Sequence, residues 1–507
     1  MAKIVEMHNI MKRFQYVQAV DNGSFDLCEG EIHSLIGENG AGKSTMMKML
    51  YGLYACDSGT IKIRGKEVPK NYSTFDAIVM EIGMVHQEFM LAKELIVLEN
   101  IIVGSEPKKK RFLIDRDEAA KRIRYYIENY RMNVQLDKKV ASISVGEAQR
   151  VEIIKALYRG ANILILDEPT AVLTPQESEK LFEILETMKK DGKSIVFISH
   201  KLKEVMQISD RITVMRGGKY MGTVAKSETS IPELAKMMVG REVLYDIRHK
   251  ANPTDEVVLK VENLVVPSER ELSKLKGISF EVRGGEILGV AGVDGNGQTE
   301  LGDALAGFVT PDGGKITICG KDVTGKRPGQ IRGAGLTHIP EDRNVRGLNK
   351  ALDIKNNLAA YEIGQPPYTQ RGMLNKDAIR GKADERIQKF DIRPANGDVM
   401  VASLSGGNAQ KVIVARELDL HGKLLLANQP TRGVDIGSIE SIRNFIGSAT
   451  DSGAGVLLIS ADLDEILSLA DRIIVLYEGR ITGEIVNDGN VDEMELGLMM
   501  TGGKSVE

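Results

Sequence analysis

The stretch GENGAGKST, residues 37–45, occurs a second time in altered form as GVDGNGQTE, residues 292–300. The first copy fits the pattern GxxxxGK followed by Ser or Thr, and it lies between the apolar run HSLI and a segment with helical periodicity. Glycines let the backbone N–H groups of such a loop converge on phosphate oxygens, and the following helix N-terminus adds partial positive charge. In this pattern Lys43 reaches the terminal phosphates and Ser44 holds Mg²⁺. The sequence therefore predicts a phosphate loop between a strand and a helix.

The similarity between the two copies extends far beyond the loop. Three further pairs of segments occur in the same order in both halves: CDSGTIKIRGK (56–66) with PDGGKITICGK (311–321), SVGEAQRVEI (144–153) with SGGNAQKVIV (405–414), and SDRITVMRGGK (209–219) with ADRIIVLYEGR (470–480). The first pair is separated by 255 residues and the other two by 261, so the second half carries six extra residues in its middle. The repeat predicts two homologous domains, residues 1–245 and 257–507, joined by a short polar linker at residues 246–256.

The composition is that of a globular protein without an excess of either charge. The 507 residues include 67 Lys and Arg against 71 Asp and Glu, which provides no overall field to attract nucleic acid or an anionic membrane. Three cysteines, Cys28, Cys56 and Cys319, lack the spacing of a disulfide framework or a zinc site. The N-terminal sequence does not read as a secretory signal, and no apolar run approaches about eighteen residues. We therefore expect a cytoplasmic chain that can still dock on a membrane protein.

Three pairs of apolar runs predict parallel strands at matching places in the two halves. These runs are GEIHSLIG (30–37) with GGEILGVAG (284–292), ANILILD (161–167) with KLLLAN (423–428), and KSIVFIS (193–199) with GVLLIS (455–460). Each is short and almost wholly apolar, as strands buried on both faces of a parallel sheet are. Segments with helical periodicity alternate with them, so the sequence predicts an α/β fold with phosphate chemistry at the strand ends.

Two carboxylates follow the run ILILD in the first half. Asp167 is suited to holding Mg²⁺, and Glu168 is suited to polarising an attacking water. A strand followed by an ordinary polar turn is the alternative, and the upstream phosphate loop is the evidence against it.

A helix is predicted just after the segment ISVGE. Its apolar face is formed by Val151, Ile154, Leu157 and Tyr158. Ser144 occupies the cap position, so Ser144 and Gly146 lie at a helix N-terminus, which is a natural site for an anion. An ordinary capped helix without a ligand is the alternative.

Taken in order, these motifs resemble those of the ABC-type ATPases. The motifs are the phosphate loop, Gln87 in GMVHQEF, the signature-like ISVGE, ILILDEPT, and His200 in VFISHKL. The resemblance covers essentially the whole chain, twice over, and implies two tandem P-loop NTPase domains of the ABC type. Each would have a RecA-like core, an antiparallel β subdomain and a helical subdomain that carries the signature.

The resemblance also implies roles for single residues around ATP and Mg²⁺. In the first half, the nucleotide would contact Gly37, Glu38, Asn39, Gly40, Ala41, Gly42, Lys43, Ser44 and Thr45. Phe14 would stack on adenine, Ser44, Gln87 and Asp167 would hold Mg²⁺, and Glu168, His200 and Gln87 would serve catalysis. Two of these residues have a purely structural alternative: Phe14 as a hydrophobe at a strand edge, and His200 as a histidine that only packs.

The second half has lost the chemical group at four matching positions. Lys43 corresponds to Gln298, Asp167 to Asn428, Glu168 to Gln429, and His200 to Ala461. Loss of a charge-assisted lysine contact costs about 1.5–3 kcal/mol, and loss of a general base costs about a hundred- to ten-thousand-fold in rate. The second nucleotide position is therefore expected to be nearly inert in hydrolysis.

The second half keeps the better signature, so the losses in the two halves are complementary. It reads LSGGN at residues 404–408, and its RGVD ends in Asp435 where the first half has Thr174. ABC-type ATPases resemble one another in closing head to tail. The working site would thus combine the motifs of the first half with Ser405, Gly406, Gly407, Asn408 and Asp435. The second half would serve as a lid and a non-hydrolysing brace.

Fused cassettes with one intact and one degraded site resemble the importer group for simple sugars and nucleosides. The segments HQEFMLAKELIVLENIIVGSEP (86–107) and GVDGNGQTEL (292–301) resemble the nucleoside branch more than the ribose or galactose branch. The resemblance implies a peripheral ATP hydrolase on the cytoplasmic face of the cell membrane. Its partners would be two integral-membrane permease subunits, received in grooves after Gln87 and Glu341, and an extracytoplasmic substrate-binding lipoprotein. No nucleic-acid partner is expected.

Three alternatives remain. A monosaccharide importer would use the same ATPase, because the cargo is recognised by other subunits. A soluble ATPase acting on ribosomes or nucleic acid would be expected to keep two competent sites and a long charged linker. A nucleotide sensor without turnover is disfavoured by the intact Lys43, Asp167, Glu168 and His200.

Overall fold

The structure is a computed structural model that describes residues 2–14, 17–87, 89–109, 113–171, 173–241, 252–268, 274–293 and 295–502. The chain divides into two compact units, Met1–Val243 (unit 1) and Leu244–Glu507 (unit 2). Each unit is considered by itself below. The boundary after residue 245 and the linker at residues 246–256 stay predictions, because residues 242–251 lie outside the described residues.

Unit 1 is built on a six-stranded sheet that is parallel except for one edge strand. In spatial order its strands are β12 (Lys219–Ala225), β11 (Arg211–Arg216), β3 (Ile32–Gly37), β10 (Ser194–Ile198), β9 (Ile163–Asp167) and β6 (Ile82–Val85). A four-stranded antiparallel sheet contains β2 (Val17–Cys28), β1 (Lys3–Phe14), β4 (Ser58–Ile63) and β5 (Lys66–Glu67). A small hairpin joins β7 (Lys108–Lys109) and β8 (Leu113–Ile114).

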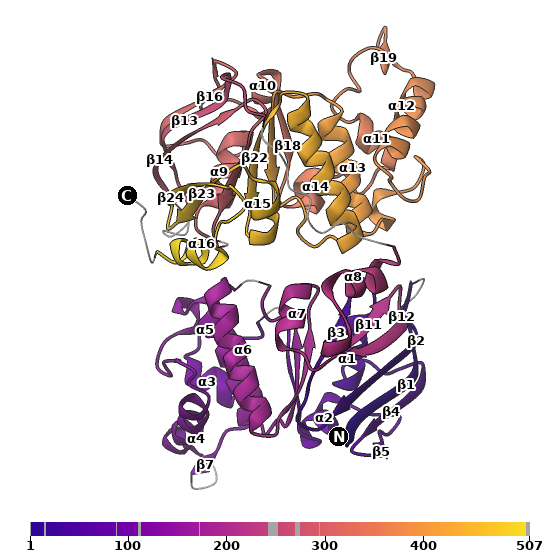
Figure 1. The fold of residues 1–507 in the computed structure, drawn as a ribbon, viewed down its shortest axis with the longest axis vertical. Helices are drawn as coiled ribbons and strands as arrows, with labels where there is room; N and C mark the ends of the chain where they lie inside the picture. The colour runs from indigo at the N-terminus through magenta and orange to yellow at the C-terminus, as the bar shows by residue number, and fades with distance from the viewer. Residues whose placement is uncertain are drawn as a thin grey trace. The chain divides into compact units, whose positions relative to one another are not determined.

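The helices of unit 1 are α1 (Lys43–Leu50), α2 (Thr74–Val79), α3 (Val97–Ile102), α4 (Arg116–Asn129), α5 (Val145–Tyr158), α6 (Pro175–Lys190), α7 (Leu202–Ile208) and α8 (Ile231–Val239). Within each unit, the antiparallel sheet and the part formed by the small hairpin and its neighbouring helices lie on opposite sides of the parallel sheet (Figure 1). This is the division into core, antiparallel β and helical subdomains that the family resemblance implied.

The parallel strands of unit 1 are buried on both faces, which explains their apolar runs. In β9, Ile163 and Ile165 pack with the antiparallel sheet and α1, whereas Leu164 and Leu166 pack with the helical part. Adjacent side chains of a strand point to opposite faces, so one run of apolar residues supplies two hydrophobic cores. The buried polar residues inside these strands, His33, Ser34 and Thr213, bond to other buried polar groups, whereas the charged residues lie at the strand ends.

Unit 2 repeats this plan with the same strand order. Its main sheet contains β18 (Leu336–Ile339), β21 (Leu424–Asn428), β22 (Gly455–Ser460), β15 (Ile287–Ala291), β23 (Arg472–Tyr477) and β24 (Arg480–Val486). Its antiparallel sheet contains β14 (Leu275–Arg283), β13 (Val257–Val266), β16 (Gly313–Ile318) and β17 (Lys321–Asp322), and its hairpin joins β19 (Thr369–Gln370) and β20 (Met373–Leu374).

The helices of unit 2 are α9 (Gln298–Ala306), α10 (Pro328–Gly333), α11 (Ile354–Ala359), α12 (Lys376–Lys389), α13 (Gly406–Leu418), α14 (Ile436–Asp451), α15 (Leu463–Leu469) and α16 (Glu493–Met500). The extra residues of the second half lie mainly between β18 and α12, which correspond to β6 and α4. A π-helical turn, Arg343–Gly347, follows β18 in this region. Among the described residues, no helix is long and apolar enough to cross a membrane.

Removing the ring of Phe197 is expected to destabilise unit 1. This side chain is fully buried in the centre of β10 and meets Phe182 of α6 edge-on at a centroid distance of 6.1 Å. We expect Phe197→Ala to lower the free energy of unfolding by about 3–5 kcal/mol. In a denaturant titration, Phe75→Ala serves as the control, because Phe75 is 74% exposed and its loss should change stability by less than about 0.5 kcal/mol. Equal effects of the two changes would contradict the assignment of this core.

Candidate active site

The phosphate loop of unit 1 lies at the carboxyl end of β3 and runs directly into α1. Gly40 and Gly42 have φ angles of 81° and 91°, in the left-handed region that favours glycine. A Cβ atom at Gly42 would lie 2.4 Å from the carbonyl oxygen of Ala19 in β2. The loop therefore needs glycine at this position for both its backbone angle and its close approach to β2.

Lys43 is buried and folded back on its own loop. Its Nζ donates hydrogen bonds to the carbonyl oxygens of Gly37 at 2.8 Å and Glu38 at 3.0 Å. Burial lowers the pKa of Lys43, while the nearby carboxylates of Glu168 and Asp167 act in the opposite direction. A bound anion, such as a phosphate, would strongly favour the protonated form of an ammonium group that burial has removed from water.

Ser44 and Asp167 form a hydroxyl–carboxylate pair beside the lysine. Ser44 Oγ donates to Asp167 Oδ1 over 2.9 Å, so the first turn of α1 is linked to the end of β9. Burial raises the pKa of the Asp167 carboxyl. Hydroxyl and carboxylate oxygens are the ligands that Mg²⁺ prefers, and the phosphates of a nucleotide would complete its shell. The residues present thus fit the predicted cation.

Glu168 is held between two other predicted site residues. Gln87 Nε2 donates to Glu168 Oε2 at 3.0 Å, and His200 Nδ1 lies 3.1 Å from Glu168 Oε1. Burial alone would raise the pKa of Glu168, but the hydrogen bond and charge of His200 hold it below its usual value. The carboxylate is therefore ionised at neutral pH and able to accept a proton from water.

The backbone at Glu168 is also unusual. Its φ angle is 49°, and its N–H donates to the carbonyl oxygen of Ile198 in β10 over 3.0 Å. Gln429, the corresponding residue in unit 2, has a φ angle of 48° and makes the same bond to Ile459 at 2.8 Å. The bend turns each side chain away from the strand direction at the carboxyl end of the strand.

Phe14 lies at the end of β1, on the hairpin whose second strand borders the loop. It pairs with Val17, and Ala19 further along β2 is the residue that contacts Gly42. Its ring is 40% exposed and meets Tyr54 edge-on at 5.3 Å. The hairpin and the phosphate loop therefore share one side of unit 1, and part of the ring is open to a ligand.

One supporting network was missed by the sequence interpretation. Glu204 of α7 accepts hydrogen bonds from Thr170 Oγ1 at 2.5 Å and Ser199 Oγ at 3.3 Å. Thr170 follows Glu168 and Ser199 precedes His200, so the network fixes the two loops that carry these side chains. The sequence signal was available, because unit 2 keeps the same three residue types as Thr431, Ser460 and Glu465.

In unit 2 the charged contacts of the phosphate loop are replaced by neutral ones. Gln298 Nε2 donates to the carbonyl oxygen of Gly292 at 3.0 Å, as Lys43 does to Gly37. Gln429 Oε1 accepts a hydrogen bond from the backbone N–H of Ala461 at 3.3 Å. Unit 2 therefore keeps the hydrogen bond that folds residue 298 onto its loop, but it lacks the lysine and the carboxylate found at these positions in unit 1.

The signature of unit 2 lies at the N-terminus of α13, which is a place where an anion is favoured. Ser405 caps the helix by accepting a hydrogen bond from the Asn408 N–H at 3.4 Å. A Cβ at Gly407 would lie 2.2 Å from Asp435 Oδ2, and one at Gly406 would lie 2.9 Å from the carbonyl oxygen of Gly433. Both glycines are required by close packing against the segment that ends in Asp435.

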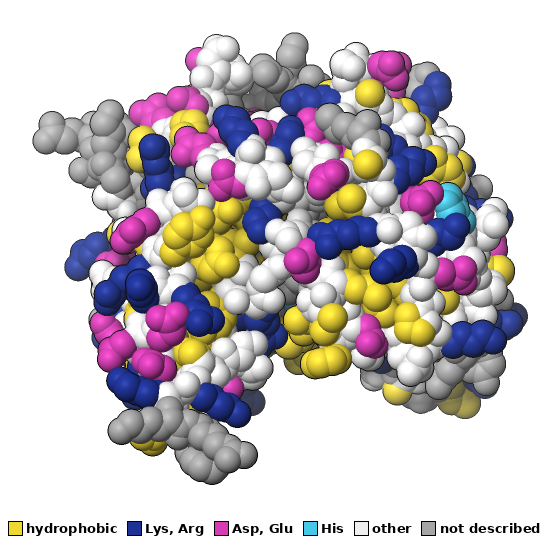
Figure 2. Space-filling view, turned by 90° about the horizontal axis from the view of Figure 1, so that it is seen from below, with side chains coloured by type: hydrophobic (Ala, Val, Ile, Leu, Met, Phe, Trp, Pro, Cys, Tyr) yellow, Lys and Arg dark blue, Asp and Glu magenta, His cyan; other side chains and the backbone are white. Residues whose placement is uncertain are grey.

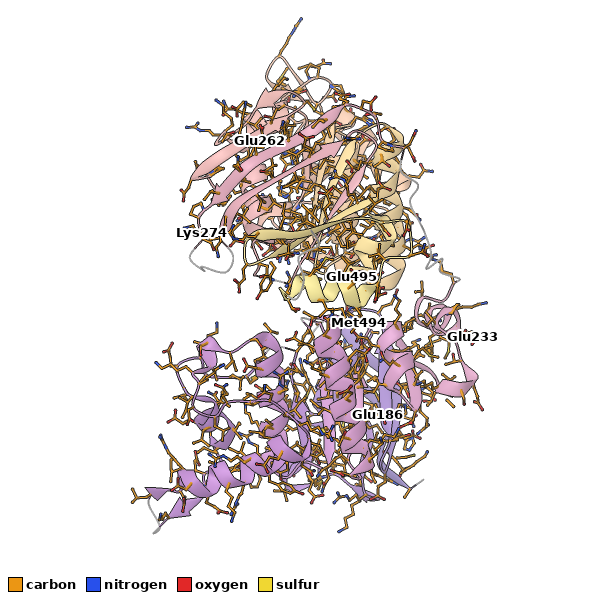
Figure 3. The ribbon with its side chains drawn as sticks, turned by 60° about the vertical axis from the view of Figure 1, so that its left-hand side comes forward. Glu186, Glu233, Glu262, Lys274, Met494 and Glu495 are labelled. Atoms are coloured by element: carbon orange, nitrogen blue, oxygen red, sulfur yellow. The ribbon has the colours of Figure 1, made fainter. Side chains whose placement is uncertain are left out.

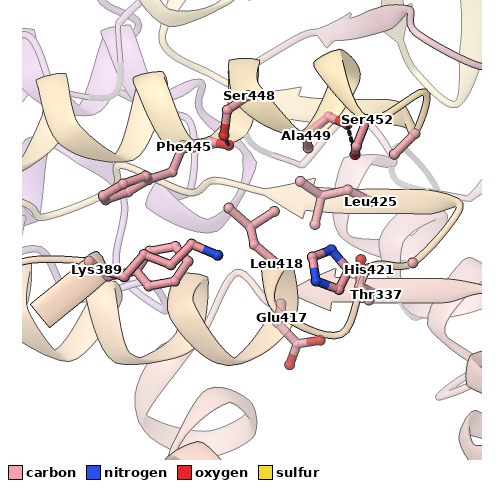
Figure 4. A pocket seen from close by; sticks show the side chains of 13 residues that line it. Thr337, Lys389, Glu417, Leu418, His421, Leu425, Phe445, Ser448, Ala449 and Ser452 are labelled. Atoms are coloured by element: carbon pink, nitrogen blue, oxygen red, sulfur yellow. Dashed lines mark hydrogen bonds between the residues drawn. The ribbon is translucent and has the colours of Figure 1, made fainter. Parts of the chain in front are cut away.

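A small cavity of about 160 Å³ in unit 2 is separate from these motifs (Figure 4). Lys389, Leu418, His421 and Phe445 line it, together with the last turns of α14. It lies at the C-terminal end of α13, whereas the signature lies at the N-terminal end of the same helix. Neither the phosphate loop nor the signature contributes to it, so it is not the predicted site.

Comparison with known proteins shows the family of the chain. The family model described as "ABC transporter" matches residues 20–171 and 275–432. In solved structures, a complex containing the archaeal ribosome recycling factor aABCE1 is similar over 94% of this chain and 90% of that one, with a TM-score of 0.61. Its sequence identity is 19%, so it shows similarity of fold alone.

Three curated relatives are similar along almost their whole length. The nucleoside import ATP-binding protein NupA of Lactococcus lactis subsp. cremoris is 45% identical, covering 99% of this chain and 98% of the relative. The guanosine import ATP-binding protein NupO of Bacillus subtilis is 44% identical over 100% and 99%. The glucose import ATP-binding protein TsgD13 of Haloferax volcanii is 42% identical over 98% and 96%.

Neutralising Asp167 is expected to stabilise the nucleotide-free chain. Because burial raises the pKa of this acid in the folded state, stability falls as the pH rises through that pKa and the buried charge forms. Asp167→Asn removes the charge and should raise the thermal midpoint at pH 7.5 by about 2–4 °C, and the gain should shrink as the pH is lowered through the raised pKa. Differential scanning calorimetry without Mg²⁺ or nucleotide measures this midpoint.

The control is Asp322→Asn, at an exposed carboxyl whose pKa is lowered by hydrogen bonds from Thr324, and it should not stabilise the protein. A lower midpoint for Asp167→Asn at pH 7.5 would contradict the burial argument.

Proposed function

The chain belongs to the ABC transporter family, and we propose that it is the energy-coupling subunit of a bacterial importer for nucleosides. Membership of this family makes the protein an ATP hydrolase. The proposal is supported chiefly by one observation: Glu168 is held by Gln87 and His200 beside Lys43 and the Ser44–Asp167 pair. Nucleosides are favoured because two similar relatives are named for nucleoside or guanosine import.

The residues of unit 1 account for the steps of hydrolysis. Lys43 and the loop N–H groups hold the terminal phosphates, and Ser44 with Asp167 provides oxygen ligands for the cation. When bound, Mg²⁺ neutralises charge on the phosphates. Glu168 accepts a proton from the water that forms the new bond to the γ-phosphorus, while the bond to the ADP oxygen breaks. His200 keeps Glu168 ionised and oriented before the reaction.

The signature of unit 2 completes this site in the proposal. Unit 1 has ISVGE, in which Val145 replaces the first glycine of the signature, whereas unit 2 keeps Gly406 and Gly407. Ser405 and the N-terminal N–H groups of α13 would bind the γ-phosphate of the nucleotide held by unit 1. The best signature and the intact phosphate loop thus serve one working site. In unit 2, Gln429 cannot act as a base, and this half acts as a non-hydrolysing brace.

The proposed partners are two integral-membrane permease subunits and an extracytoplasmic substrate-binding lipoprotein. Unit 2 has a groove of about 420 Å³ next to the segment that follows Glu341. Phe308, Pro340, Val345 and Tyr361 are among its lining residues, and Val345 is 78% exposed. Arg332 and Arg346 also line the groove and stack on Tyr361 and Phe308. We propose that this groove receives a permease helix, which would place the protein on the cytoplasmic face of the membrane.

One alternative is supported by a relative, and two are weakened by specific observations. A monosaccharide importer is the nearest, since the similar relative TsgD13 is named for glucose import. An ATPase acting on ribosomes or nucleic acid would be expected to carry an excess of basic residues, but this chain has 67 Lys and Arg against 71 Asp and Glu. On the face seen in Figure 2, positive and negative side chains are interspersed. A sensor without turnover would not need Glu168 in its hydrogen-bonded and ionised state.

The asymmetry between the two units is testable by one substitution in each unit. Glu168→Gln should reduce the steady-state ATPase rate by about a hundred- to ten-thousand-fold while ATP still binds, because the base is lost and the phosphate contacts remain. Gln429→Ala should leave the rate within about twofold of the parent, since this side chain performs no proton transfer in the proposal. Phosphate release by the complex with its permease measures both. Similar losses from the two changes would refute the asymmetric site.

The cargo assignment predicts which ligand stimulates the complex. In proteoliposomes that contain the permease and the binding lipoprotein, purine nucleosides should increase ATP hydrolysis and be accumulated. Ribose, glucose and galactose are the matched comparisons. Stimulation by a monosaccharide in place of nucleosides would establish the alternative importer.

A further inference from the structure

The cavity of about 160 Å³ in unit 2 lies where three helices end. α12 ends at Lys389, α13 at Leu418 and α14 at Asp451. Figure 4 shows Lys389 and Phe445 at one end of the cavity and His421 at the other. The residues that line it belong to none of the nucleotide-binding motifs described above. The cavity is therefore a feature of unit 2 that the hydrolysis of ATP does not use.

The same place in unit 1 is filled by a methionine. α6 and α14 correspond at the spacing of 261 residues found in the sequence, so Met188 matches Ala449. Met188 is fully buried in the core of the helical part, whereas the methyl group of Ala449 leaves the space beside it open. Phe445 is larger than Ile184 at the matching position, but its ring packs against Phe390 at a centroid distance of 4.8 Å. It therefore forms the end wall of the cavity and does not fill it.

Two hydrogen bonds that close this place in unit 1 involve residues that differ in unit 2. Asn129 Nδ2 donates to Asp191 Oδ2 at 3.0 Å, and Lys193 Nζ donates to the carbonyl oxygen of Ala161 at 3.2 Å. The residues that replace Asn129, Asp191 and Lys193 are Lys389, Ser452 and Ala454. Among the described residues of unit 2 neither bond has a counterpart, because the alanine has no donor and the serine hydroxyl bonds to its own helix. These replacements, together with the loss of the methionine, open the cavity.

The walls of the cavity are mainly apolar. They are formed by Phe390, Leu418, Leu425, Phe445 and Ala449. The hydroxyls of Ser448 and Ser452 donate at 2.8 and 2.7 Å to carbonyl oxygens of their own helix (Figure 4). Cavities of about 150 Å³ with apolar walls hold a benzene ring. The size and lining of this cavity therefore suit a single aromatic ring.

One negatively charged side chain lines the cavity, but its charge is compensated inside the protein. Glu417 is fully buried, and its Oε2 accepts hydrogen bonds from Arg332 Nη2 at 2.8 Å and from the His338 N–H at 3.1 Å. Its Oε1 accepts a hydrogen bond from Arg416 Nε at 3.1 Å. The carboxylate of Glu417 therefore does little to repel an anion bound in the cavity.

Lys389 supplies positive charge at the exposed end of the cavity. Its Nζ lies 5.2 Å from the centre of the Phe390 ring and 3.2 Å from Asp419 Oδ1. An ammonium group has three N–H donors, so Lys389 can donate to a second anion while it keeps Asp419. The side chain is 54% exposed, so an incoming molecule can reach it. A carboxylate is the group that such a donor binds through short, charge-assisted hydrogen bonds.

We propose that the cavity binds a small aromatic carboxylate, with its ring between the apolar walls and its carboxylate at Lys389. The rings of Phe390 and Phe445 offer edge and face contacts to an aromatic ring. The occupant would contact the C-terminal end of α13, the helix whose N-terminus carries the signature. The site shares no residue with the proposed nucleotide site, so it does not depend on the proposed function.

Ligand-observed ¹⁹F NMR on the full-length chain tests the site with 4-fluorobenzoate as the probe. We expect a dissociation constant of about 1 mM or below, in line with the binding energy available to so few atoms. Fluorobenzene has the ring without the carboxylate and should bind at least about threefold more weakly. 4-Fluorobenzylamine carries the opposite charge and should bind more weakly still, because Lys389 repels it.

Two substitutions toward the residues of unit 1 separate the ring from the charge. Ala449→Met fills the cavity and should weaken the binding of 4-fluorobenzoate by at least about tenfold. Lys389→Asn should bring the affinity for 4-fluorobenzoate to within about twofold of that for fluorobenzene, and the fold should stay intact because the side chain is on the surface. The matched control is Lys274→Asn. Lys274 immediately precedes β14 of the antiparallel sheet (Figure 3), and its loss should change the affinity by less than about twofold.

Three results would overturn the inference. The first is failure of the parent chain to bind 4-fluorobenzoate below about 10 mM. The second is equal affinity of the parent, Ala449→Met and Lys389→Asn chains, since binding would then occur elsewhere on the protein. The third is tighter binding of 4-fluorobenzylamine than of 4-fluorobenzoate, which would contradict the assigned charge. ATP hydrolysis is measured separately, so none of these results bears on the proposed function.

Discussion

The chemistry of this protein depends on the burial of its parallel strands on both faces. Leu164 and Leu166 of β9 face one hydrophobic core and Ile163 and Ile165 face the other, so no polar side chain fits along the strand. The polar side chains inside neighbouring strands, such as His33 and Thr213, bond to each other within the core, and the candidate functional groups lie where the strands end. The carboxyl ends of β3, β6, β9 and β10 therefore bring the phosphate loop, Gln87, Glu168 and His200 together from distant parts of the chain.

The same scaffold in unit 2 shows which features belong to the fold and which to the reaction. The strand order, the glycine angles of the loop and the hydrogen bond from residue 298 to its own loop are kept. What differs are the ionisable groups: amides replace Lys43, Asp167 and Glu168, and an alanine replaces His200. In the proposed function, these few exchanges are what make one unit a catalyst and the other a support.

Much of the core was predictable from the sequence, because apolar runs and glycine spacing are local signals. The strands ending at Asp167, Ile198 and Asn428, and the capped helix after Ser144, lie where the patterns indicated. Contacts between segments that are distant in the sequence were harder to predict. The bond between Thr299 and Glu341 could not be foreseen, because the extra residues of the second half obscure the alignment near Glu341. The hydrogen bonds from Thr170 and Ser199 to Glu204 likewise depend on loops that only the fold brings together.

The left-handed bend shared by Glu168 and Gln429 has a consequence for how the catalytic geometry is set. A strained residue at an active site is often interpreted as energy stored for the reaction. Here the same angle persists in the half that has no base, with the same backbone bond to the neighbouring strand. The bend is thus a property of the strand end in both units, and it sets the orientation of the side chain whether that side chain is a carboxylate or an amide.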